Sequence, residues 1–222
     1  MKQNQAGFTL IEIAIVLVII GLLLGGVLKG QELINSAKVK NLAGDFRNIP
    51  LFIYGYQDKF RALPGDDALS SDHVSAVPAT GTIGNGVIDG YWNSLTDTDE
   101  SFRFWQQVRL ANLASGQTTL PTGTITDSIP YFLQNAAGGR IGVESGSANP
   151  PIHGLRGSYI ICSKNIVGKF AKQLDVTLDN GETNSGSMMA MQNNTTPTAG
   201  DRDQPPISPL DDATLYTVCM GV

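Results

Sequence analysis

One carboxylate lies inside the longest apolar run of the sequence, where a charged side chain is not expected. The run Phe8–Leu28 contains a single charged residue, Glu12. An ionised carboxylate in hydrocarbon is costly unless a cation pairs with it, so a glutamate at this position is expected to have a function. If the hydrophilic residues 1–7 that precede this run were cut off after Gly7, the α-amine freed on Phe8 could be this cation. The pair could form within one subunit or between stacked subunits, where it would set the register of assembly.

The two histidines are the obvious candidates for acid–base chemistry. His73 and His153 both lie in loop-like sequence, and the chain contains no G-x-S-x-G, H-E-x-x-H or P-loop motif. Each histidine is therefore expected to be exposed and inert. We predict that the protein is not an enzyme and has no catalytic residue, since an anchored hydrolase would need one of these two side chains.

Residues 84–90, with the sequence GNGVIDG, resemble the centre of a calcium loop. An EF-hand also needs oxygen ligands at its first, third and twelfth positions, and these are Gly81, Ile83 and Trp92 when the loop is aligned on Gly86. An EF-hand is therefore excluded. A looser calcium site at Asn85 and Asp89 stays open, as does a plain glycine turn, and no other cofactor is expected. Further carboxylates for such a site would come from Asp66, Asp67, Asp97 or Asp99.

The apolar run itself predicts a membrane-spanning helix. Its 21 residues would form a helix about 31 Å long, which matches the hydrocarbon core of a bilayer. A secretory signal would be cut after its apolar region, yet Lys29 follows Leu28 and no small-residue cleavage site is present. If a segment is removed, it is the hydrophilic leader, residues 1–7.

The six residues from Gly7 to Glu12, GFTLIE, resemble the cleavage and methylation motif of type IV prepilins and type II secretion pseudopilins. The resemblance implies that prepilin peptidase cuts after Gly7, that Phe8 becomes N-methylated, and that Glu12 guides addition of the subunit to a filament. It also implies a single-pass protein of the bacterial inner membrane with its head in the periplasm, which later reaches a pilus or the cell surface. A plain signal anchor is the alternative.

The remaining sequence predicts one head domain of an α+β, pilin-like fold. We expect residues 8–28 to form the transmembrane half of a long helix, residues 29–63 its amphipathic half with a bend near Pro50, and residues 64–222 a head built on a small antiparallel sheet. Within the head the pattern predicts helices at 101–115 and 166–174, strands at 128–133, 140–144, 158–163, 176–178 and 216–220, and a long loop at 183–209.

The two cysteines fall in a middle strand and in the last strand of this prediction. Cys162 and Cys219 are an even pair in a chain that would face an oxidising periplasm, and with only two histidines to help they do not make a metal site. We expect them to form a disulfide. This would match the disulfide-bounded C-terminal region of many type IV pilins, here residues 162–219.

The resemblance, together with the apolar helix and the cysteine pair, implies a structural subunit of a type IV pilus-like filament. Its expected partners are copies of itself or related pilins, prepilin peptidase, the inner-membrane assembly machinery and, before assembly, membrane lipid. Nucleic acid is not expected, because the net charge is −5. A type II secretion pseudopilin and a membrane-anchored extracytoplasmic binding module remain alternatives. Gly21, Gly25, Gly26 and Gly30 either allow close helix packing or loosen the helix, and the sequence does not decide between these roles.

Overall fold

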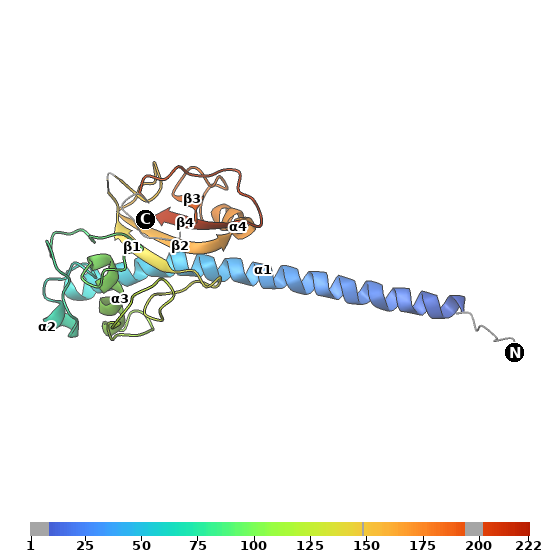
Figure 1. Ribbon diagram of the computed structural model, residues 1–222, viewed down its shortest axis with the longest axis horizontal. Coiled ribbons are helices and arrows are strands. Elements are labelled where there is room, and N and C mark those ends of the chain that lie inside the picture. The colour runs from blue at the N-terminus through green and yellow to red at the C-terminus, as the bar shows by residue number, and fades with distance from the viewer. Residues whose placement is uncertain (1–8, 148, 194–201) are drawn as a thin grey trace. The chain divides into compact units, whose positions relative to one another are not determined.

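The computed structural model describes residues 9–147, 149–193 and 202–222. Its helices and strands, in chain order, are α1 (Leu10–Phe60), α2 (Ser70–Val74), α3 (Glu100–Leu110), β1 (Ile141–Ser145), β2 (Tyr159–Val167), α4 (Gly168–Leu178), β3 (Met188–Gln192) and β4 (Leu215–Gly221) (Figure 1). The chain divides into two compact units between Lys38 and Val39.

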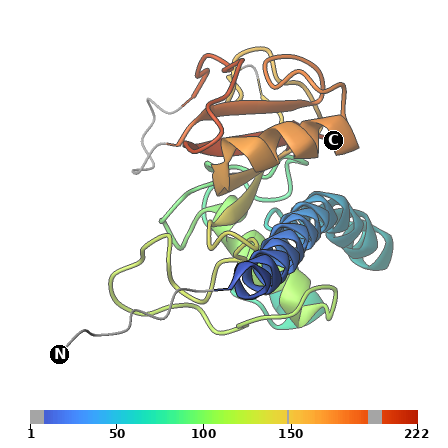
Figure 2. The same cartoon turned by 90° about the vertical axis from the view of Figure 1, so that its right-hand side faces the viewer.

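The second unit is organised around a four-stranded sheet in the order β1-β2-β4-β3, with every neighbouring pair antiparallel. Helix α4 contacts β2, β3 and β4, and Figure 2 shows it lying across the sheet. Side chains of β3 alternate between two buried clusters: Met188 and Ala190 join one cluster, while Met189 and Met191 join the other. The sheet is therefore covered on both faces.

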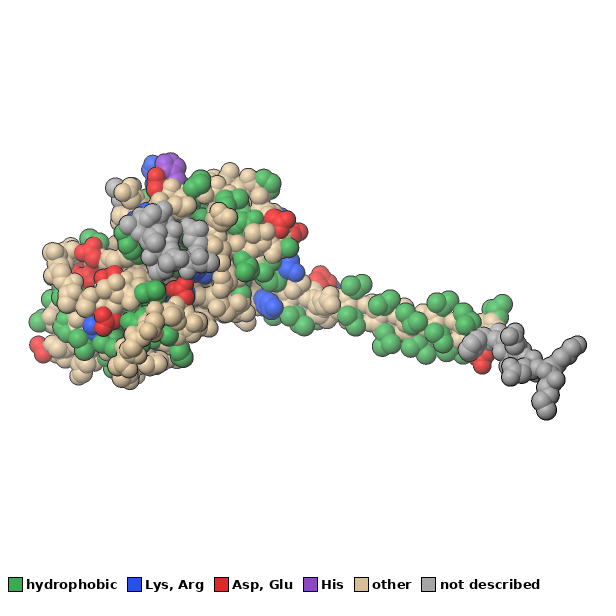
Figure 3. All heavy atoms as spheres, in the orientation of Figure 1, with side chains coloured by type: hydrophobic (Ala, Val, Ile, Leu, Met, Phe, Trp, Pro, Cys, Tyr) green, Lys and Arg blue, Asp and Glu red, His purple; other side chains and the backbone are tan. Residues whose placement is uncertain are grey.

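The first unit contains the N-terminal part of α1, and its apolar side chains are exposed. Every residue from Leu10 to Leu28 is exposed, and Figure 3 shows hydrophobic side chains all along this part of the helix. The helix is long and apolar enough to cross a membrane, by length and composition. The predicted apolar first half of the helix is confirmed.

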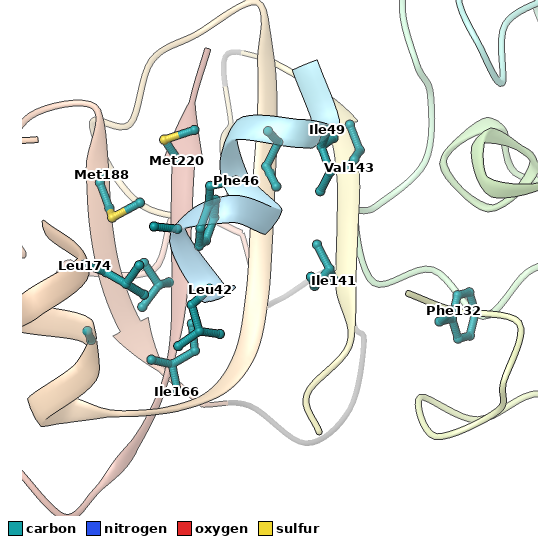
Figure 4. Packing of buried hydrophobic residues seen from close by; sticks show 14 of the residues in the cluster. Leu42, Phe46, Ile49, Phe132, Ile141, Val143, Ile166, Leu174, Met188 and Met220 are labelled. Carbon is teal, nitrogen blue, oxygen red and sulfur yellow. The ribbon is translucent and has the colours of Figure 1, made fainter. Parts of the chain in front are cut away.

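In the second unit, α1 is amphipathic: one face of the helix is buried and the other is exposed. Its buried residues recur every three or four positions, with one adjacent pair at 42 and 43. They are Val39, Leu42, Ala43, Phe46, Ile49, Ile53 and Tyr56. Figure 4 shows Leu42, Phe46 and Ile49 pointing toward side chains of the sheet, and all three are at most 1% exposed. The helix is unbroken at Pro50, where the bend stays a prediction, and it ends at Phe60 rather than at Leu63. The predicted α+β fold, a long helix packed on a small antiparallel sheet, is thus confirmed.

Several predicted elements of the head match the structure closely. The strands expected at 140–144, 158–163 and 216–220 are β1, β2 and β4, with β2 extending further to Val167. The helix expected at 101–115 is α3, which ends earlier, at Leu110, where Asn112 adopts a positive φ of 62°. Such a left-handed residue stops a helix, and asparagine accepts it more readily than most residues.

Other predicted elements are wrong. Residues 128–133 form turns instead of a strand, because Pro130 has no N–H for a ladder. The strand expected at 176–178 is the last turn of α4, which begins at Gly168 instead of 166 because β2 continues to Val167. The loop expected at 183–209 contains β3; residues 202–209 have no helix or strand, as expected, and residues 194–201 lie outside the described residues. The short helix α2 was not predicted.

Candidate functional site: the N-terminal apolar segment

Glu12 forms a reciprocal capping box with Thr9 at the start of α1. The Thr9 hydroxyl and the Thr9 backbone N–H both donate to Glu12 Oε2, each at 2.7 Å, and the Glu12 backbone N–H donates to Thr9 Oγ1 at 3.4 Å. Two helix N-terminal donors are satisfied in this way. The Thr-x-x-Glu spacing in the sequence is the signal from which this capping box could have been predicted.

The rest of the Glu12 carboxylate is available to a partner from outside. Its Oε1 atom accepts no hydrogen bond, and no Lys, Arg or His side chain pairs with it, within residues 9–147, 149–193 and 202–222. The predicted partner, the α-amine of Phe8, and the predicted cleavage residue Gly7 both lie outside the described residues. The Phe8–Glu12 pair therefore stays a prediction.

The glycines of the apolar segment are not explained by contacts within the chain. A Cβ atom built on Gly21, Gly25, Gly26 or Gly30 would have no neighbouring side chain or backbone atom within 4 Å. Glycine in a helix interior costs about 1 kcal/mol relative to alanine. Close approach of another helix or local loosening of α1 remain the two explanations.

The predicted disulfide is present. Cys162 and Cys219 are directly paired neighbours on β2 and β4, and their sulfur atoms are bonded. Both side chains are fully buried in the cluster that also contains Trp92, Ile152 and Leu155. The bond joins the two central strands and encloses α4 and β3 between them.

The calcium candidates Asn85 and Asp89 lie in a loop whose backbone is hydrogen-bonded to the Asp66 carboxylate. Asp66 Oδ1 accepts hydrogen bonds from the backbone N–H groups of Gly84 and Asn85, and Oδ2 accepts one from Gly86 at 2.7 Å. Asn85 Nδ2 donates to Asp89 Oδ2 at 3.1 Å. The described part of the chain forms no group of three or more His, Cys, Asp or Glu side chains that could hold a metal. Calcium binding at Asn85 and Asp89 stays a prediction.

The histidines take part in local hydrogen bonds. His73 Nδ1 lies 2.8 Å from Asp67 Oδ2, which also accepts a hydrogen bond from the Tyr56 hydroxyl at 2.7 Å. These contacts tie α2 to the end of α1. His153 Nδ1 lies 2.8 Å from Asp203 Oδ1, and neither ring is hydrogen-bonded to a Ser or Cys side chain within the described residues. The sequence did not reveal the pairing of His73 with Asp67, and the expectation that His73 is exposed is wrong, because its side chain is only 27% exposed.

Comparison with known proteins gives one match. Residues 2–28 match the family model described as the prokaryotic N-terminal methylation motif. Comparisons with curated proteins and with solved structures found no match. The matched segment includes Gly7, Phe8 and Glu12 together with the exposed apolar part of α1. Proteins with this motif are usually structural subunits without enzymatic activity. Through residues 2–28 the chain thus carries the N-terminal methylation motif that is typical of type IV pilins and pseudopilins.

Proposed function

We propose that this protein is a structural subunit of a type IV pilus-like filament. The observation that carries the proposal is the methylation motif at the start of an apolar helix whose side chains are all exposed from Leu10 to Leu28. An apolar surface of this length must be covered by lipid or by other apolar helices. In the proposed cycle it is covered first by the inner membrane and later by other subunits.

The proposed processing and location follow from the same segment. Prepilin peptidase cuts after Gly7, so that the mature chain begins at Phe8, and the amine of Phe8 is methylated. The head lies in the periplasm before assembly and at the cell surface afterwards. The disulfide between Cys162 and Cys219 supports an oxidising location for the head.

The capping box supports a specific role for Glu12 in assembly. Thr9 holds Oε2 of the carboxylate in a fixed position, whereas Oε1 accepts no hydrogen bond within the described residues. The proposed partner of this carboxylate is the terminal amine of a neighbouring subunit. Such a pair leaves neither charge uncompensated in the apolar interior of the filament and fixes the axial position of the incoming helix.

A type II secretion pseudopilin is the second candidate, because the matched motif is typical of both classes. The pilus role is preferred because the second unit is large, from Val39 to Val222, and contains the disulfide-bounded region. Deletion of the gene separates the two roles. Loss of surface filaments supports a pilus subunit, whereas loss of an exported enzyme from the medium with normal filaments supports a pseudopilin.

The first test is the intact mass of the N-terminal peptide of protein extracted from membranes. In cells with prepilin peptidase, the peptide is expected to begin at Phe8 and to carry one methyl group on its amine. In cells without the peptidase it should begin at Met1, which serves as the control. A peptide that begins at Met1 in both strains would contradict the filament proposal and favour an anchored binding module.

A second test concerns the glycines of the apolar segment. Replacing both Gly25 and Gly26 with alanine should stabilise the isolated helix by about 1 kcal/mol for each substitution, because the added methyl groups meet no atom of the chain. If neighbouring helices pack against these glycines or α1 loosens there, the yield of sheared filaments should fall although the protein still inserts into the membrane.

Gly44→Ala provides the matched control for this test. Gly44 lies in the same helix beyond the apolar segment, and a Cβ atom there also meets no atom within 4 Å. We expect Gly44→Ala to leave the filament yield close to that of the wild type. A normal yield from the Gly25→Ala, Gly26→Ala double variant would show that neither helix packing nor loosening requires these glycines.

A further inference from the structure

A small polar cavity lies in the second unit and is lined by none of the residues of the apolar segment Leu10–Leu28. Its volume is about 170 Å³, and its lining residues are Asp127, Ser128, Gly138, Arg140, Lys164, Asn165 and Asn193. Pockets for drug-sized ligands usually measure about 300–1,000 Å³. This polar cavity therefore has room only for a small ion or for a single side-chain group.

Two buried cations share one carboxylate in the polar cavity. Arg140 is 2% exposed and Lys164 is 6% exposed. Asp127 Oδ1 lies 3.2 Å from Arg140 Nη1, and Asp127 Oδ2 lies 2.7 Å from Lys164 Nζ. Asp127 is the only carboxylate that lines the cavity within the described part of the chain. The three ionised groups leave a net charge of +1, and an uncompensated buried charge is costly.

Among the described residues, both cations of the polar cavity have N–H donors without an acceptor. Arg140 Nε is buried and has no acceptor among the described residues. The ammonium group of Lys164 has three N–H donors but donates only to Asp127 within the described residues. Burial lowers the pKa of Arg140 to about 10, so the guanidinium is still charged at neutral pH.

The Arg140 guanidinium is held rigidly by the backbone of a neighbouring loop. Nη1 donates to the carbonyl oxygen of Asn93 at 3.0 Å, and Nη2 donates to that of Ser94 at 2.8 Å. Its guanidinium carbon also lies 3.4 Å from the centre of the Phe132 ring. A cation fixed in this way loses little conformational entropy when an anion binds.

We propose that the polar cavity binds a small oxyanion, either phosphate or a carboxylate group, which accepts hydrogen bonds from Lys164 and balances the charge shared with Arg140. The group comes either from a free ion or from an acidic side chain of a second copy of this chain. The second source fits the composition of the chain, which has 20 acidic and 15 basic residues. Only the second source rests on the proposed filament.

The free-ion source is tested with the full-length protein in detergent. Inorganic phosphate or acetate should raise the midpoint of thermal unfolding at constant ionic strength, whereas chloride should not. Asp127→Asn removes the competing carboxylate and raises the net charge of the cavity to about +2, so it should tighten the Kd for phosphate roughly tenfold. Lys164→Met should abolish the effect of phosphate.

Asp212 and Lys172 provide matched controls, because they form an ion pair of the same length, 2.7 Å, but are exposed. Asp212→Asn and Lys172→Met should bind phosphate as the wild type does. If Asp127→Asn fails to fold, the titrations of the wild type and of Lys164→Met still decide the result.

The second source is tested by zero-length carbodiimide cross-linking of assembled Asp127→Asn protein, made from a mixture of ¹⁵N-labelled and unlabelled copies. An amide bond between Lys164 and an Asp or Glu of the other isotope would identify a carboxylate of a second copy as the ligand. A shift with phosphate or acetate and no such cross-link would identify a free ion. If the full-length protein shows neither an anion-dependent shift nor a cross-link, the site does not exist, whatever the fate of the filament proposal.

Discussion

Replacing Glu12 with alanine is expected to reduce the yield of filaments roughly tenfold or more, which corresponds to a loss of at least about 1.4 kcal/mol per subunit addition. The substitution removes the carboxylate that Thr9 holds at the start of α1. Cleavage after Gly7 and membrane insertion should continue, because neither step needs the pairing of Glu12 with another subunit. The measurement is the amount of this protein in the sheared filament fraction relative to the membrane fraction.

Glu12→Gln separates the observed capping of α1 from the proposed pairing with a terminal amine. The amide oxygen of glutamine can still accept the hydrogen bonds from Thr9, but it carries no charge. If pairing with a terminal amine drives assembly, Glu12→Gln should be as defective as Glu12→Ala. If the capping box alone matters, Glu12→Gln should restore the filaments.

Glu32→Ala is the matched control on the same helix. Glu32 is exposed and pairs with Lys29 at 2.6 Å, an interaction that contributes little at a surface. We expect its filament yield to equal that of the wild type. Normal filaments from Glu12→Ala would remove the main support for the assembly role and favour the anchored binding module.

The sequence was sufficient wherever a periodic pattern and a physical requirement coincided. The run from Phe8 to Leu28 is long and apolar enough to span a membrane, and α1 is a continuous helix from Leu10 onward. Phe46, Ile49 and Ile53 recur at helical spacing, and all three are buried in the cluster that also contains side chains of the sheet. The cysteines fall in short apolar runs that turned out to be paired strands.

Prediction failed where local sequence carries little information about tertiary packing. Strand β3 has the sequence MMAMQ, which contains no β-branched or aromatic residue, so nothing marked it as a strand. It forms because Met188 and Met189 fill opposite faces of the sheet. The sequence around Tyr131 predicts a strand, but the segment forms a turn. There the buried Tyr131 side chain stacks on the Phe102 ring, and its hydroxyl donates to the Phe102 carbonyl oxygen.

The polar cavity could not be predicted for a different reason. Asp127, Arg140 and Lys164 are far apart in sequence: Asp127 lies in a loop, Arg140 immediately precedes β1, and Lys164 lies in β2. Their meeting depends on the antiparallel pairing of β1 with β2, in which Ile141 lies opposite Ser163. A single sequence does not reveal this register. The loop held by Asp66 is of the same kind, because the carboxylate and the amides that it binds are separated by 18 to 20 residues.

Removing the disulfide is expected to lower the free energy of unfolding of the head by about 4 kcal/mol, given the 57-residue separation of Cys162 and Cys219. The cross-link restricts the unfolded chain, so its loss favours the unfolded state even if the native packing is kept. Alanine is the appropriate replacement at both positions, because a serine hydroxyl would be buried in the apolar cluster around Trp92. The measurement is chemical denaturation of the Cys162→Ala, Cys219→Ala double variant and of the wild type.

Two comparisons show whether the cross-link itself is responsible. The wild type treated with a thiol reductant should unfold at nearly the same denaturant concentration as the double variant, whereas the double variant should not respond to the reductant. Met189→Leu changes a side chain in the same buried cluster without changing the cysteine sulfur atoms, and a volume-conserving substitution of this kind should cost less than about 1.5 kcal/mol.

A domain is typically stable by only about 5–15 kcal/mol, so a loss of about 4 kcal/mol should also reduce the amount of folded head available for assembly. If the double variant unfolds at the same denaturant concentration as the wild type, packing on both faces of the sheet holds β2 and β4 together without help from the bond.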